Sequence, residues 1–185
     1  MGFPLDSKES LNRFLANVER RALRMAQFAS RNSDTALDLV QEAMMKFSER
    51  YATRPEGEWR VLFYRVLQSR IIDWHRRSTV RKRIFGWLGR GYEEEGESDP
   101  IERVADSKTP GPFEKMRQSE AGAAMEKAIR ALPLRQRQAF LLRAWEGLDI
   151  AQTAAVMGCS EGSIKTHYSR AVSTLRRILE DFAHE

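Results

Sequence analysis

Near the C-terminal end of the sequence, small, hydroxyl-bearing and cationic side chains recur at the spacing of one helix face. The residues of this face are Gly162, Thr166, Ser169, Arg170 and Ser173, with Lys165 on its flank. Small side chains let a helix backbone approach a DNA major groove, while lysine and arginine reach phosphates and base edges. The chemistry that this pattern predicts is the reading of duplex DNA.

The elements that must position these side chains are two helices joined by a tight turn. Ile150–Met157 predicts a short amphipathic helix, with Ala154 where a second helix packs closely, and Gly158 supplies the positive φ of the turn. Ser160 is a natural N-cap for the second helix, residues 161–177. Its buried face is expected to hold Ile164, Tyr168, Ala171, Val172 and Leu175. The pattern predicts a helix-turn-helix, and a plain helical hairpin within a core is the alternative.

A second candidate surface combines arginines with aromatic rings in the N-terminal half. A helix is expected at residues 58–83, with an apolar stripe formed by Trp59, Leu62, Phe63, Val66, Leu67, Ile71 and Trp74. The residues that fall mostly outside this stripe are Arg60, Tyr64, Gln68, Arg76 and Arg77. Cations that contact phosphates, beside rings that stack on unpaired bases, are typical of proteins that bind single-stranded DNA. Core packing is the preferred interpretation for Trp59, Phe63 and Trp74, whereas that of Tyr64 stays open.

Two further helices are expected upstream. Residues 11–28 place apolar side chains at three- and four-residue spacing, and residues 31–34 indicate a turn with a capping residue. The next helix, residues 35–51, is expected to bury the face formed by Leu37, Val40, Met44 and Phe47. Pro55 and Gly57 follow it, and both oppose helix continuation. Because alternating strand patterns are absent, the sequence predicts an all-α fold.

Charge is distributed unevenly along the chain. Residues 59–91 carry nine Lys and Arg against one acid, a net +8, whereas residues 92–106 carry seven acids against one arginine, a net −6. Residues 84–118 also hold five of the eleven glycines and three of the six prolines, a composition typical of a linker. We therefore expect two small helical domains, residues 1–83 and 119–185, joined by a flexible acidic linker, residues 84–118.

The sequence also indicates which chemistry to exclude. Cys159 is the only cysteine, which excludes an intramolecular disulfide and favours a reducing compartment. Residues 1–15 lack an apolar signal segment, so we expect a cytoplasmic protein without membrane insertion. His75, His167 and His184 have no metal-ligand spacing, so neither a metal nor a cofactor is expected. No phosphate-binding glycine loop, nucleophile elbow or catalytic triad occurs, so we expect no small-molecule substrate and no enzyme.

Four motifs in a fixed order resemble those of one protein family. They are Asp38-Leu39-Val40-Gln41-Glu42, the helix at residues 62–77 with Asp73 and Arg76, Ala131-Leu132-Pro133 followed by Glu146-Gly147-Leu148, and Ser163-Ile164-Lys165-Thr166. Across nearly all of its length, the chain resembles bacterial RNA polymerase sigma factors of the sigma-70 family, in the extracytoplasmic-function (ECF) group. The family commonly has Asn at the position of Ser69 and an aromatic at that of Leu62, and these departures concern the −10 base preference.

The resemblance implies a sigma region 2 helical bundle, a sigma region 4 helix-turn-helix and three sets of contacts. The residues implied to dock on core RNA polymerase are Asp38, Leu39, Gln41, Glu42 and Met45. Those implied to hold the single-stranded −10 element, with a base extruded at the loop of residues 51–58, are Tyr51, Arg54, Arg60, Tyr64, Gln68, Ser69, Asp73, Arg76 and Arg77. Those implied to read the −35 element as duplex are Ser160, Gly162, Ser163, Lys165, Thr166, Ser169 and Arg170.

The implied partners are core RNA polymerase, promoter DNA and an anti-sigma factor. For the acidic linker, charge mimicry of nucleic acid at residues 93–97, a disordered spacer and fold-back inhibition of the basic helix are alternatives. A stand-alone helix-turn-helix regulator that binds duplex DNA is the alternative function, although it leaves the motif at residues 38–42 and the arginine-rich helix without a purpose. An enzyme acting on nucleic acids would need metal-binding carboxylates or a nucleophile, and none is arranged in the sequence.

Overall fold

The computed structural model describes residues 5–30, 32–87 and 120–183. The chain divides into two compact units, Met1–Arg103 and Val104–Glu185. All elements in the described ranges are helical, which confirms the prediction of an all-α protein. The expected linker lies outside the described residues apart from residues 84–87, which continue a helix. No helix in the described ranges has both the length and the apolar character needed to cross a membrane.

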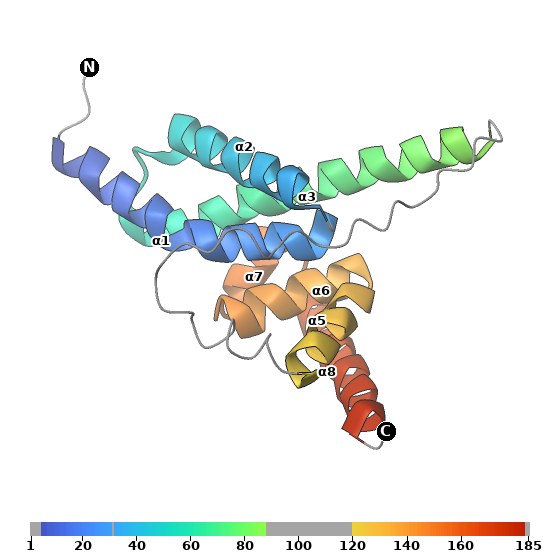
Figure 1. The fold of residues 1–185 in the computed structure, drawn as a ribbon. Coiled ribbons are helices and arrows are strands. Elements are labelled where there is room, and N and C mark those ends of the chain that lie inside the picture. Colours follow the sequence, from blue (N-terminus) through green and yellow to red (C-terminus); the bar gives the residue numbers. More distant parts are fainter. Residues whose placement is uncertain (1–4, 31, 88–119, 184–185) are drawn as a thin grey trace. The chain divides into compact units, whose positions relative to one another are not determined.

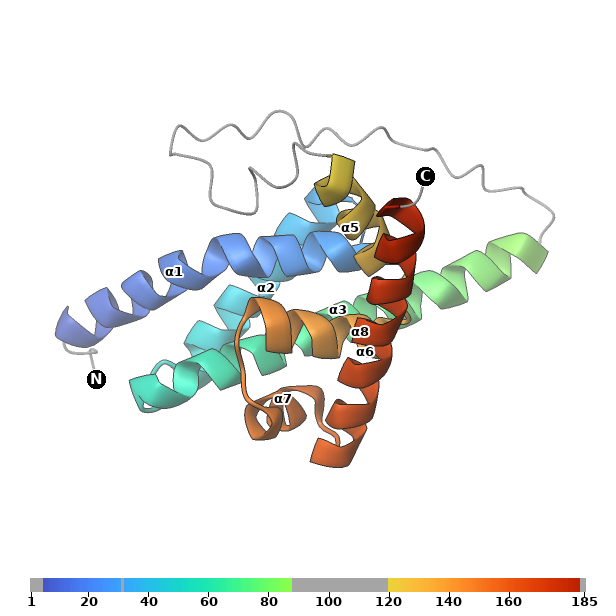
Figure 2. The ribbon, with the colours of Figure 1, turned by 90° about the horizontal axis from the view of Figure 1, so that it is seen from below.

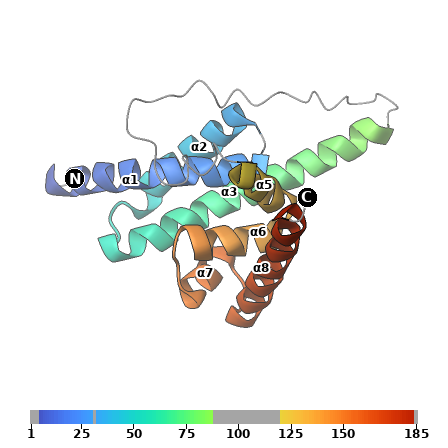
Figure 3. The same ribbon diagram turned by 60° about the horizontal axis from the view of Figure 1, so that its bottom comes forward.

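The described part of the first unit contains three helices (Figure 1): α1 (Leu5–Ser30), α2 (Ser33–Tyr51) and α3 (Glu56–Trp87). α2 packs against both α1 and α3, and α1 also contacts α3. In Figures 1, 2 and 3 the C-terminal half of α3 projects beyond its two neighbours. The backbone of this part of α3 therefore lies outside the contact between the three helices.

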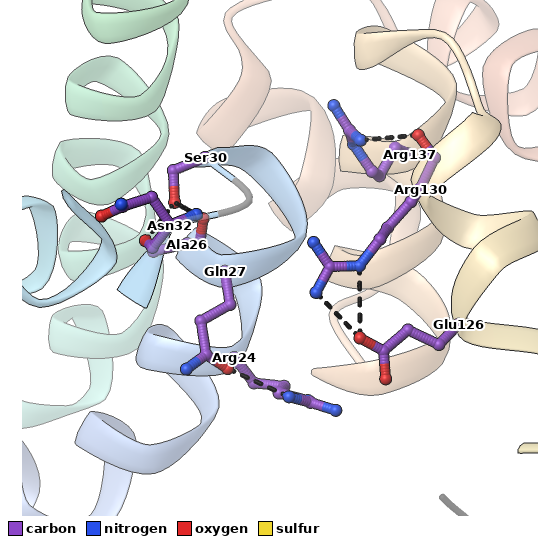
Figure 4. A network of polar contacts seen from close by, with 8 residues as sticks. All are labelled: Arg24, Ala26, Gln27, Ser30, Asn32, Glu126, Arg130 and Arg137. Atoms are coloured by element: carbon purple, nitrogen blue, oxygen red, sulfur yellow. Dashed lines mark hydrogen bonds and ion pairs between the residues drawn. The ribbon is translucent and has the colours of Figure 1, made fainter. Parts of the chain in front are cut away.

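The turn between α1 and α2 is fixed by polar side chains at the helix ends. The Ser30 hydroxyl lies 3.0 Å from the carbonyl oxygen of Ala26 and 2.9 Å from that of Asn32 (Figure 4). Asn32 Oδ1 accepts a hydrogen bond from the backbone N–H of Thr35 at 2.8 Å, which makes Asn32 the N-cap of α2. An N-cap of this type contributes about 1 kcal/mol, so the predicted turn with a capping residue is confirmed.

An aromatic cluster forms the core of the first unit. Phe47 and Phe63 are fully buried, and Trp59 is 3% exposed. The ring of Phe14 lies with its centroid 5.5 Å from those of both Phe47 and Trp59, and Phe47 meets Phe63 edge-on at 5.8 Å. Such pairs contribute about 0.5–1.5 kcal/mol beyond the burial of their area. The interpretation of Trp59 and Phe63 as core residues is thus confirmed.

Five apolar residues of the first unit are more exposed than expected: Leu37 is exposed, and Met44, Leu62, Val66 and Trp74 are half-buried. Leu37 is 42% exposed, because α2 instead buries the face formed by Ala36, Leu39, Val40, Ala43 and Phe47. Alanines at two of these positions allow close helix contact, so the packing face of α2 is turned by one residue from the predicted one. Trp74 is only half-buried, since it lies in the half of α3 that extends beyond α1 and α2.

The second unit contains four described α-helices and one π-helical turn. In chain order these elements are α5 (Glu120–Ala131), α6 (Leu134–Phe140), η2 (Leu141–Trp145), α7 (Ile150–Met157) and α8 (Glu161–Ala183). α8 contacts α5, α6 and α7 (Figures 2 and 3). Its residues Ile164, Ala171 and Leu175 are buried, as predicted, whereas Tyr168 and Val172 are half-buried.

The π-helical turn between α6 and α7 has no counterpart in the sequence prediction. The N–H of Glu146 donates to the carbonyl of Leu141 at 3.0 Å, and that of Leu148 donates to the carbonyl of Leu142 at 3.0 Å. Both bonds span more residues than the bonds of an α-helix. Gly147, with φ +65°, then turns the chain toward α7.

Buried polar side chains support the helices within each unit (Figure 4). In the second unit, Arg130 forms an ion pair with Glu126 at 2.8 Å, and Arg137, 7% exposed, donates to the carbonyl of Arg130 at 3.0 Å. In the first unit, Arg24 donates to Gln27 at 3.0 Å. Each buried cation thus has a polar partner, which offsets the free-energy cost of removing it from water.

Candidate nucleic-acid interface

α7 is an eight-residue helix whose two ends are well defined. The carboxylate of Asp149 accepts from the N–H of Gln152 at 2.7 Å, and the side-chain oxygen of Gln152 accepts from the N–H of Asp149 at 3.0 Å, which forms a capping box. Gly158 ends the helix with φ 61° and ψ 42°, so the predicted positive-φ turn is confirmed. The following N–H, that of Cys159, donates to the carbonyl of Ala154 at 3.2 Å.

The second helix, α8, begins with hydroxyl groups. Ser160 Oγ accepts from the N–H of Ser163 at 3.1 Å and lies 2.9 Å from the Ser163 hydroxyl. The side chain of Ser160 thus caps α8, as its position in the sequence predicts. One turn later, Thr166 Oγ1 donates to the carbonyl of Gly162 at 3.0 Å. Together α7, the Gly158 turn and α8 form a helix-turn-helix.

The outward face of α8 carries the side chains expected to read duplex DNA. Six of the seven predicted residues are exposed: Ser160, Gly162, Lys165, Thr166, Ser169 and Arg170. Ser163 is half-buried, because its hydroxyl is engaged at the helix start. Two exposed cations, Arg176 and Arg177, extend this basic face toward the end of α8, beyond the predicted set.

Tyr64 and Gln68 do not lie on a DNA-binding face, and their assignment to the −10 contact is wrong. Tyr64 is fully buried, with its ring centroid 5.4 Å from that of Phe63. Gln68 is 2% exposed, and its Nε2 donates to the sulfur of Met25 at 2.8 Å. α3 packs against both α1 and α2, so it buries a wider stripe than contact with a single helix would require.

The remaining residues of the −10 set lie on α3 and on the loop before it. Arg54, Ser69, Arg76 and Arg77 are exposed, while Tyr51, Arg60 and Asp73 are half-buried. The guanidinium of Arg54 contacts the carboxylate of Glu58 through Nε and Nη2, at 3.1 and 2.8 Å. The Trp59 indole N–H donates to the Arg54 carbonyl at 2.8 Å, which fixes this loop on the aromatic core.

The candidate docking residues on α2 fall into two groups. Asp38, Gln41 and Glu42 are exposed, and Met45 is 64% exposed. Leu39 is only 5% exposed, so its side chain belongs to the core of the first unit rather than to a docking surface. Leu37, which was predicted to be buried, is exposed and lies one turn before Gln41.

Three arginines that the sequence analysis did not single out contact residues on other elements. Arg70 of α3 lies 3.9 Å from the carboxylate of Glu42 on α2. Arg135 of α6 donates to the carbonyl of Met157 at 3.3 Å, and Arg143 of η2 donates to that of Leu148 at 2.5 Å. The partner residues lie on other elements or beyond a turn, so the spacing of residues within one helix could not predict these contacts.

The described residues contain no group of three or more His, Cys, Asp and Glu side chains that could hold a metal ion. Both α8 and α3 present exposed cationic and hydroxyl side chains. Such an arrangement can bind a polyanion, and its chemistry is that of recognition.

Comparison with known proteins places the chain in a family. Residues 122–175 match the family described as sigma-70, region 4. An RNA polymerase sigma-E factor of Streptomyces antibioticus is 30% identical over 146 residues, which cover 78% of this chain and 71% of that protein. The ECF RNA polymerase sigma factor SigM of Mycobacterium tuberculosis is 28% identical over 160 residues, 86% of this chain and 72% of SigM. The chain belongs to the sigma-70 family of RNA polymerase sigma factors, in its extracytoplasmic-function group.

A further relative is longer than this chain. The ECF RNA polymerase sigma factor BldN of Streptomyces coelicolor is 33% identical over 154 residues, which are 80% of this chain. The chain spans about half (52%) of the length of BldN.

Two solved structures share the fold. The sigma factor RpoE in complex with the anti-sigma factor NepR, from Bartonella quintana, has a TM-score of 0.65 at 23% identity and covers 91% of this chain and 96% of that one. CnrH, in complex with the cytosolic domain of CnrY, has a TM-score of 0.60 at 15% identity and covers 94% of this chain and 90% of CnrH. The fold of this chain is thus that of RpoE and CnrH.

Proposed function

We propose that the chain binds core RNA polymerase and directs it to promoters that carry specific −10 and −35 elements. It acts in the cytoplasm, by binding rather than by catalysis. The observation that carries the proposal is the exposed hydroxyl and cationic face of α8, on a helix-turn-helix whose turn and caps are complete.

The −35 element is read as duplex by α8. Its first three turns expose Gly162, Thr166 and Ser169, whose small side chains permit close approach to the major groove. Lys165 and Arg170 flank these residues and reach base edges or phosphates. In a helix-turn-helix, the second helix enters the groove with its N-terminal residues at the bases, which is the part of α8 where this set lies.

The −10 element is held as a single strand by the exposed residues of α3 and its preceding loop. The exposed contacts come from Arg54, Ser69, Arg76 and Arg77. Further contacts come from the half-buried residues Tyr51, Arg60 and Asp73. Stacking on aromatic groups contributes about 1–3 kcal/mol per base in single-stranded DNA complexes. Tyr64 is buried in the core and cannot stack on a base. The half-buried Tyr51 offers the ring of this set for stacking.

Core RNA polymerase docks on α2. The exposed apolar side chains of Leu37 and Met45 lie two turns apart on one face, with Gln41 between them and the acids Asp38 and Glu42 beside them. An apolar centre with a polar margin is the usual composition of a protein–protein interface. Carboxylates at the margin favour a basic partner surface through charge complementarity.

An anti-sigma factor is proposed as a further partner. The two sigma factors with the same fold were solved in complex with NepR and with the cytosolic domain of CnrY. For this chain, the acidic stretch at residues 93–97, outside the described residues, leaves fold-back inhibition as the competing account. Replacing Glu93, Glu94, Glu95 and Glu97 with Gln separates the two accounts, since only fold-back predicts a gain in DNA binding by the free chain at low salt.

The test of the proposed function is promoter binding with and without core RNA polymerase. The probe is a duplex selected from a randomised pool by core polymerase loaded with the chain, compared with a scrambled duplex and with core polymerase alone. Discrimination between the two duplexes should arise only when chain and core are combined. Equal discrimination by the chain alone would instead identify a stand-alone regulator.

A further inference from the structure

Arg143, on a third element, contacts both the residue that leads into α7 and the side of α8. Its Nη1 donates to the carbonyl of Leu148 at 2.5 Å, directly before the Asp149 N-cap of α7. Its guanidinium carbon lies 5.6 Å from the centre of the Tyr168 ring on α8. One side chain of η2 therefore links the start of α7 to the middle of the DNA-facing part of α8.

The ring of Tyr168 is also held from α6. Phe140 stacks on it with ring centroids 6.3 Å apart and an angle of 17° between the planes. Tyr168 is half-buried and directly precedes the exposed pair Ser169 and Arg170. Fixing this ring therefore fixes the rotation of α8 about its own axis at the residues that face DNA.

The π-helical turn explains why Arg143 can make both contacts. Leu141 and Leu142 are buried side by side, which uses two consecutive positions for the core. The widened turn then places the next residue, Arg143, outside that core and toward Tyr168 and Leu148. Such turns occur frequently at functional sites.

The hydrogen bond from Arg143 supplies a partner for the carbonyl of Leu148. Leu148 is fully buried, and a buried carbonyl without a partner destabilises the fold. A hydrogen bond from a charged guanidinium is stronger than one from a neutral donor. Arg135, which contacts Met157 near the other end of α7, holds the C-terminal end of the same short helix.

Base contacts and phosphate contacts respond differently to a shift of α8. A hydrogen bond to a base edge weakens steeply when its angle and distance change. The electrostatic attraction to phosphates depends little on such small displacements and carries no sequence information. A residue that fixes α8 would therefore act on discrimination between sequences and leave non-specific affinity almost unchanged.

We propose that Arg143 is a positioning residue for −35 recognition, which sets the orientation of α8 through Leu148 and Tyr168 without contacting DNA. The inference rests on the proposed function of α8. Arg143 donates the hydrogen bond to Leu148 and supplies the cation of the cation–π contact, and Tyr168 supplies the aromatic ring.

The experiment compares Arg143→Met, Tyr168→Leu and the double variant in full-length chain bound to core RNA polymerase. The probes are the selected −35 duplex and its scrambled version. Each single variant should lower the preference for the selected duplex by about tenfold, because each interrupts the link from Leu148 through Arg143 to Tyr168. The double variant should lose little more than either single one, because both remove the same link.

Three matched variants complete the design. Tyr168→Phe keeps the ring and should retain the preference, and Arg143→Lys, which keeps the charge but not the planar group, should recover only part of it. Lys127→Met removes an exposed cation of α5 and should leave the preference unchanged. Urea unfolding of each free chain shows whether the second unit remains folded, and Tyr168→Leu serves where Arg143→Met does not fold.

Two results would overturn the inference. Equal losses of affinity for the selected and scrambled duplexes, with a salt dependence reduced by about one phosphate contact, would make Arg143 a direct DNA contact. An unchanged preference in folded Arg143→Met would show that the link has no effect on recognition. A wild-type chain without any preference, even with core polymerase, would instead refute the proposed function itself.

Discussion

The outer side chains of α8 take no part in the core, so each can be replaced without loss of packing. Arg170 is exposed, whereas the next residue along the helix, Ala171, is fully buried. Surface substitutions of this kind usually change stability by less than about 0.5 kcal/mol. An effect of such a substitution on promoter use can therefore be attributed to altered DNA recognition, because the stability of the fold changes little.

Arg170→Ala should weaken use of promoters that depend on their −35 element. Loss of a bidentate base contact costs about 1–3 kcal/mol and relaxes the preference at one base position. Run-off transcription from a set of promoters with single-base changes measures this. Lys127→Ala on α5 is the control, and unchanged transcription by Arg170→Ala would show that α8 enters the groove in another orientation.

A second prediction at this scale concerns α2. Asp38→Lys combined with Glu42→Lys should lower the affinity for core RNA polymerase by about tenfold or more, since both changes reverse charge on the proposed docking face. Both residues are exposed, so helicity should not change. Fluorescence titration with core enzyme gives the affinity. Glu19→Lys, an exposed reversal on α1, should bind as the wild type does, and equal binding by the double variant would remove α2 from the interface.

At the level of elements, the turn between α7 and α8 depends on one backbone conformation. Gly158 has φ +61° and no atom within 4 Å of an added Cβ, so a side chain there meets conformational strain and not a clash. Gly158→Ala should therefore destabilise the second unit by about 1 kcal/mol. Gly57→Ala, at an equally open site in α3 without positive φ, should be neutral or slightly stabilising. Urea unfolding of both variants provides the comparison, and equal effects would contradict this account.

Helices, turns and the exposed face of α8 could be predicted because their signals are local. Gly158, Ser160 and the exposed positions of α8 follow from spacing within a few residues. Tyr64 and Gln68 were misassigned because α3 packs against two helices at once, which no pattern within α3 reveals. The burial of Leu39 and the exposure of Leu37 were mispredicted for a similar reason, since packing of α2 on both neighbours selects its buried face. The link from Arg143 to Tyr168 depends on a π-helical turn, and the sequence gives no sign of it.

At the level of the whole molecule, each unit has a core of its own. The first is built on the aromatic cluster around Phe47 and Phe63, and the second on Leu142, Leu148 and Ile164, all fully buried. The fragments at residues 1–87 and 120–185 should therefore each unfold cooperatively in urea, as small domains with separate cores do. Loss of helicity by either fragment alone, measured by circular dichroism, would show that the units depend on each other.

The two sides of α8 have separate tasks, with Ile164, Ala171 and Leu175 packed inside and the DNA-facing residues outside. In evolutionary terms, this separation allows the proposed promoter preference to change through the outer residues of α8 while its buried residues stay the same. On the proposed function, a copy made by gene duplication can exchange Lys165, Thr166 or Ser169 one residue at a time, and we expect each intermediate to remain folded, because all three residues are exposed. New regulons can thus arise by substitutions on a single helix face, without a new fold and without a period of instability.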